Sequence, residues 1–85
     1  MAIELLMLAD GHCSLEFAPE DMAAVRKAII TLHGKPTVQW HAVCADIRFG
    51  GCNFTFQDEW DDPCLISGSD EGDALLRELH ARLTG

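Results

Sequence analysis

The side chains with the greatest chemical potential in this sequence are its four cysteines, Cys13, Cys44, Cys52 and Cys64. His41 precedes Cys44 by three residues and His12 adjoins Cys13, and a zinc site or a reactive thiol can be built from such pairs. No Cys-x-x-Cys pair occurs, and strand alternation predicts that Cys44 points away from the face of Cys13 and Cys52. We therefore expect no metal and mainly reduced structural thiols. A metal- or redox-active thiol at Cys44 and a pair of disulfides are the alternatives.

Nucleophilic catalysis requires a nucleophile, a base and a third group that orients the base. Cys44 with His41, or Ser67 with Asp70 and His80, supplies suitable residue types. Neither set belongs to a recognisable motif, because the sequence has no G-x-S-x-G elbow, phosphate-binding loop or G-x-G-x-x-G run. We expect no catalytic residues and no cofactor, and we do not expect an enzyme.

The most distinctive charged segment runs from Phe49 to Leu76, where seven acidic residues occur and no Lys or Arg. Solvated loops and the first turns of helices commonly carry such acids. The functional interpretation is a docking surface for a basic partner, with a tryptophan as its apolar anchor. The predicted partner-binding residues are Asp58, Glu59, Trp60, Asp61, Asp62, Asp70, Glu71 and Asp73.

The overall charge limits the class of partner. A formal charge of −8 argues against binding to nucleic acid or to an anionic membrane surface, since both require a basic face. No apolar stretch is long enough to span a bilayer, and the first residues lack the features of a signal peptide. We expect a cytoplasmic, bacterial protein that binds another protein with a basic surface. An immunity-type or inhibitor role is the sharpest form of this hypothesis.

The elements that must position these residues follow from hydrophobic periodicity. Helices are predicted over 19–33 and about 71–83, where apolar residues recur at three- and four-residue spacing. Strands are predicted near 3–9, 12–17, 37–49, 52–57 and 64–66. The order β-β-α-β-β-β-α over 85 residues predicts one α+β domain, spanning 1–85, with a five-stranded, mostly antiparallel sheet and two helices on one face.

Two hairpins follow from turn residues. Gly50-Gly51 predicts pairing of Phe49 with Cys52, which gathers every apolar side chain of both strands on one face. Asp10-Gly11 predicts a two-residue turn that pairs Leu8 with Cys13. The pairing of Leu8 with Cys13 leaves apolar residues of strand 3–9 on the outer face. Trp40 joins them unless the strand bulges or breaks near 41–43. A self-association surface, and with it a homodimer, is therefore predicted at Ile3, Leu5, Met7 and Trp40.

Overall fold

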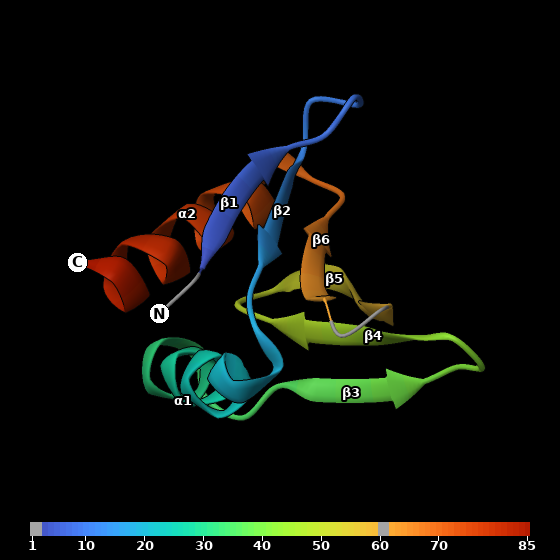
Figure 1. Ribbon diagram of the computed structural model, residues 1–85, viewed down its shortest axis with the longest axis horizontal. Coiled ribbons are helices and arrows are strands. Elements are labelled where there is room, and N and C mark those ends of the chain that lie inside the picture. The colour runs from blue at the N-terminus through green and yellow to red at the C-terminus, as the bar shows by residue number, and fades with distance from the viewer. Residues whose placement is uncertain (1–2, 60–61) are drawn as a thin grey trace.

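The structure is a computed structural model that describes residues 3–59 and 62–85. Figure 1 shows two helices on one side of a single sheet. The strands are β1 (Glu4–Met7), β2 (Cys13–Glu16), β3 (Thr37–Trp40), β4 (Cys44–Phe49), β5 (Cys52–Glu59) and β6 (Asp62–Ser67). The helices are the short 3₁₀ turn η1 (Pro19–Asp21), α1 (Met22–His33) and α2 (Asp70–Thr84). All strands pair antiparallel in the order β1-β2-β6-β5-β4-β3, so β1 and β3 are the edges.

The α+β class is confirmed, and the sheet has six strands where the sequence predicted about five. The additional strand comes from segment 37–49, which was expected to be one strand. The chain reverses at Ala42–Val43, where the His41 N–H donates to the Cys44 carbonyl at 2.8 Å. This turn contains no Gly, Pro, Asn or Asp, so it lacks the residues by which turns are recognised. The reversal returns Trp40 to the helix-covered face, opposite Ala45.

The predicted register of the first hairpin is wrong by one residue. The Leu8 N–H donates to the His12 carbonyl, and the Gly11 N–H donates to the Leu8 carbonyl at 3.0 Å. Gly11 has φ of +87°, which fits a three-residue loop that ends in a left-handed glycine. Leu5 therefore pairs with Leu15.

A one-residue change of register turns every side chain of β1 to the other face of the sheet. Ile3 is consequently a core residue that is only 6% exposed, and Leu5 packs against the core. Met7 stays 68% exposed at the sheet edge. The expected outer-face patch of Ile3, Leu5 and Met7 is therefore wrong, because these side chains point to the helix-covered face.

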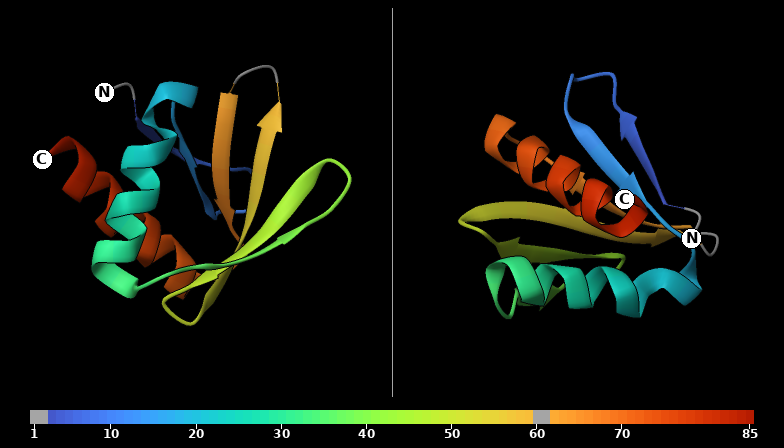
Figure 2. Two further views of the ribbon diagram at one scale, coloured as in Figure 1. Left: turned by 90° about the horizontal axis from the view of Figure 1, so that it is seen from below. Right: turned by 90° about the vertical axis from the view of Figure 1, so that its left-hand side faces the viewer.

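The second hairpin has the predicted register, with Phe49 opposite Cys52 and Ile47 opposite Phe54. Both helices also lie where the spacing predicts. α2 begins at the N-cap Ser69, whose Oγ accepts the Gly72 N–H at 3.0 Å. Figure 2 shows both helices on the same side of the sheet, and the core side chains lie between the helices and the sheet. Its side chains include Leu15, Val25, Ile29, Phe54, Leu65, Leu76 and Leu79.

Candidate functional site

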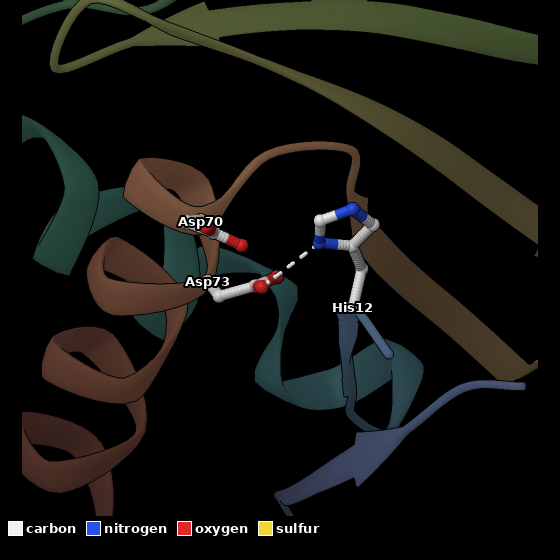
Figure 3. A group of neighbouring side chains, drawn as sticks. All are labelled: His12, Asp70 and Asp73. Carbon is white, nitrogen blue, oxygen red and sulfur yellow. Dashed lines mark hydrogen bonds and ion pairs between the residues drawn. The ribbon is translucent and has the colours of Figure 1, made fainter. Parts of the chain in front are cut away.

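A cluster of ionisable groups joins the β1–β2 loop to the start of α2. His12 Nδ1 lies 2.9 Å from Asp73 Oδ2, and the Cys13 N–H donates to Asp73 Oδ1 at 2.9 Å. Figure 3 shows the imidazole facing the Asp73 carboxylate, with Asp70 in the same first turn of α2. Because a carboxylate only accepts hydrogen bonds, His12 Nδ1 is the donor. Asp73 is 4% exposed, so this contact is partly buried.

The protonation states in this cluster follow from these contacts. Burial by itself raises the pKa of Asp73, but the hydrogen bonds from His12 and the Cys13 N–H outweigh it and lower the pKa from 3.8 to about 2. The same hydrogen bond raises the pKa of His12 above 6.5, against a smaller desolvation effect. Asp73 is therefore ionised near neutral pH, and its charge favours the protonated imidazole.

His12, Asp70 and Asp73 also place three potential metal ligands within 4.8 Å of one another. Both oxygens of Asp73 already accept hydrogen bonds from the protein, and a cation would have to displace the proton on His12 Nδ1. The geometry is that of a structural contact that fixes the β1–β2 loop on α2. In the sequence His12 is notable only beside Cys13, and no local spacing links it to a residue 61 positions away.

The predicted acidic docking residues do not form one surface. Asp58 and Asp62 are exposed at the β5–β6 hairpin, whereas Asp70 and Glu71 are exposed at the start of α2. The six residues of β6 separate these groups by roughly 17 Å at about 3.4 Å per residue. Asp73 is buried beside His12. Trp60, Asp61 and the side chain of Glu59 lie outside the described residues.

A second acidic group, which no local pattern in the sequence indicates, lies on the outer face of the sheet near the β5–β6 hairpin. Glu4 is the cross-strand partner of Glu16, and Asp62 of β6 lies close to Glu16. Burial raises the pKa of Glu16 most, and the negative charges of Asp62 and Glu4 raise it further. Like charges are therefore held together here, although Glu4 and Glu16 are 12 residues apart in the sequence.

All four cysteines are free thiols in this structure. Cys13 is buried at 2% exposure, and burial raises the pKa of Cys64. A low pKa is the mark of a reactive cysteine, so Cys64 has the opposite character. Nε2 of His41 lies 2.8 Å from Asp46 Oδ2, so this nitrogen is engaged by a carboxylate. The thiol alternative gains no support from these contacts.

An apolar groove lies between α1 and the sheet, and we call it the α1–β3 groove. Its volume is about 270 Å³. Figure 2 (left) looks onto this side, where α1 and β3 diverge from their short connection with β5 and β6 behind them. Among the described residues that line it, Arg26 is the one with a charge. The apolar lining includes Val25, Ile29, Val38, Trp40, Ile47 and Phe56.

The surroundings of the groove are unusually apolar for a free surface. Among the described residues, seven large hydrophobic side chains are exposed, and five of them belong to α1, β3 or the turn after β3. Trp40 is 70% exposed, although its ring meets Phe56 edge-to-face at 6.1 Å between centroids. Val43 in the turn is 79% exposed. The sequence predicted Trp40 as a contact residue but gave no sign of the groove beside it.

No helix among the described residues is long and apolar enough to cross a membrane. Comparison of the chain with protein-family models, with curated proteins and with solved structures gives no match.

Proposed function

We propose that this protein is a non-catalytic protein-binding module, and that the α1–β3 groove receives an apolar part of its partner. The observation that carries the proposal is the groove itself, with Trp40 exposed on its wall. Pockets of this kind, apolar with few polar groups, are typical of binding sites. Arg26 is an isolated charge in the described lining, so the groove offers no acid–base pair for catalysis.

The energetic support comes from Trp40. An aromatic side chain of this size offers up to about 250 Å² of surface, of which 70% is exposed here. Covering that area removes roughly 175 Å² from water, a gross gain of about 4 kcal/mol at 25 cal/mol per Å². Association and side-chain ordering offset part of this gain. Trp40 therefore has the size and position of a binding hot spot.

The test compares two exposed apolar positions. Trp40→Ser changes the groove, and Met7→Ser changes a side chain of similar exposure on β1. Immobilised wild type and both variants are used to capture proteins from a lysate of the native organism. We expect a specific protein that wild type and Met7→Ser retain and that Trp40→Ser loses. Equal retention by both variants would remove the groove from the proposal.

A second candidate function is docking of a basic protein, including the inhibitor or immunity role suggested by the net charge of −8. The observation that favours it is the acidic group of Glu4, Glu16 and Asp62, where a basic partner would relieve repulsion. Its test is Glu4→Gln with Asp62→Asn, compared with Asp70→Asn and Glu71→Gln at the other end of β6. Capture that is salt-sensitive and weakened only by the first pair would support it.

A further inference from the structure

The free edge of β3 carries unpaired backbone groups in a defined pattern. β3 is the last strand of the sheet, and β4 is its one neighbour among the described strands. The His41 N–H donates to the Cys44 carbonyl, so these two residues form a hydrogen-bonded pair. Such pairs alternate along an antiparallel ladder. Gln39 therefore bonds to β4, whereas the N–H and C=O groups of Val38 and Trp40 point away from the sheet.

Within β3, this edge lacks the charged side chains and the bulges by which many proteins prevent strands from pairing. Thr37, Val38, Gln39 and Trp40 carry no charge, and all four are exposed. The ladder between β3 and β4 runs without a bulge. Short length, proline, charged side chains, bulges and covering segments are the usual protections of an edge strand. Of these, β3 is short and follows Pro36. An edge with free donors, free acceptors and apolar side chains is a template for another strand.

We propose that a second copy of this chain pairs with β3, antiparallel, about a twofold axis that passes beside Gln39. An axis perpendicular to the sheet keeps the helix-covered faces of both copies on the same side. Within the bounds of β3, Val38 must then lie opposite Val38 or Trp40 of the second copy, because these side chains share that face. The first choice would place Pro36, which has no N–H, in a bonding position. The register that remains pairs Val38 with Trp40 of the second copy.

This register satisfies all the free groups of the edge. Val38 and Trp40 of each copy donate to and accept from Trp40 and Val38 of the other, which gives four backbone hydrogen bonds. Two aromatic–aliphatic pairs form across the junction, and such pairs stabilise sheets. The two sheets become one sheet of twelve strands. The Ala42–Val43 turn of the second copy then lies beside the first residue of β3. This position is close to the end of α1, because only three residues separate α1 from β3.

Local charge permits this association in spite of the net charge of −8. No acidic residue occurs within β3 or in the described lining of the α1–β3 groove, and the uncharged Gln39 meets its own copy at the axis. The other edge differs, since Glu4 of β1 lies opposite Glu16, which Asp62 also approaches. A second acidic copy is therefore repelled more strongly at β1 than at β3.

The test is disulfide trapping at the axis. In the proposed register Gln39 and its copy form a non-hydrogen-bonded pair with Cα atoms about 4.5 Å apart, which a disulfide can span. Thr37 and its copy are four residues out of register, roughly 13 Å apart. We expect Gln39→Cys to give a cross-linked dimer under mild oxidation, and Thr37→Cys and wild type to give none. Wild type measures the cross-linking that the four native cysteines give without the introduced one.

Two further measurements complete the test. Sedimentation of reduced wild type, from roughly 5 to 500 µM, is expected to approach twice the monomer mass of 9.3 kDa, because a short strand junction gives a weak interface. Gln39→Asp places two carboxylates at the axis and is expected to weaken association about fivefold.

Any of three results would overturn the proposal. These are a constant monomer mass, equal cross-linking of Gln39→Cys and Thr37→Cys, or cross-linking of Leu6→Cys on β1 in place of Gln39→Cys. The inference uses the backbone edge and is independent of the proposed groove function. A strictly monomeric protein that still captures a partner through Trp40 would refute the dimer alone.

Discussion

Replacing Asp73 by Asn tests the contact that ties the first hairpin to α2. The substitution keeps the shape of the side chain and an oxygen that can accept the Cys13 N–H, but it removes the charge that His12 faces. Asp70→Asn is the matched control, because Asp70 lies in the same helical turn and is exposed. Both variants lose one acidic charge near the start of α2, so the effect of the helix dipole is removed in each.

The expected magnitude follows from the pKa of Asp73. Its fall from 3.8 to about 2 means that the folded protein favours the ionised carboxylate. At 1.36 kcal/mol per pH unit this corresponds to about 2 kcal/mol, present above pH 3.8 and lost as the pH falls toward 2. His12 acts in the opposite direction, because its pKa is raised. Its contribution is present below pH 6.5 and is lost as the pH rises through the folded-state pKa.

The assay is urea unfolding followed by far-ultraviolet circular dichroism at several pH values between 2 and 8. We expect Asp73→Asn to be about 2 kcal/mol less stable than wild type at pH 5 to 6, with the difference shrinking toward pH 2. Asp70→Asn is expected to follow wild type within about 0.5 kcal/mol. Equal losses in the two variants, or a loss in Asp73→Asn that does not change with pH, would refute the assignment of an ionised, hydrogen-bonded Asp73.

Three further predictions concern the fold, and each is checked by the free energy of unfolding in urea. Gly11→Ala should cost about 1 kcal/mol, because Gly11 has a φ of +87°. The control Gly68→Ala should be neutral or slightly stabilising, because Gly68 has open space and no such φ; equal effects of the two changes would contradict the three-residue loop. The raised pKa of Glu16 means that the folded protein disfavours the ionised carboxylate, so wild type loses stability as the pH rises through 4.5. Glu16→Gln should therefore stabilise the protein at pH 7 and have no effect at pH 3, where the wild-type carboxyl is protonated. Leu15→Ala should cost about 2–5 kcal/mol and Leu6→Ala less than about 1, since Leu15 is fully buried and Leu6 is 39% exposed; similar costs would place β1 in the other register.

The parts of the fold that could be predicted are those where short-range signals agree. In the β4–β5 hairpin the turn residues and the alternation of apolar side chains both require Phe49 opposite Cys52. α2 has its Ser69 cap and an apolar stripe that the spacing of leucines already defines. Each of these features depends on residues within a few positions of one another, so the sequence contains the whole argument.

The parts that could not be predicted depend on distant residues or on unmarked turns. Asp10-Gly11 is compatible with a two-residue and with a three-residue loop, and the core decides between them by burying Ile3. The Ala42–Val43 turn has no turn-forming residue, and its position is set by the pairing of β3 with β4. These two features change which face of β1 is apolar and where Trp40 lies, and so they relocate the predicted contact surface.

The sequence by itself determined the class of fold, the two helices, the second hairpin and the acidic character, because these follow from composition and from periodicity within single elements. Only the tertiary structure decided which ionisable groups meet. It separated the acidic segment into groups at opposite ends of β6, and it brought Asp73 to His12 and Glu4 to Glu16. It also formed the α1–β3 groove and left the β3 edge open. The physical reason is that strand order and register fix distances between residues far apart in the chain, and no local pattern specifies them.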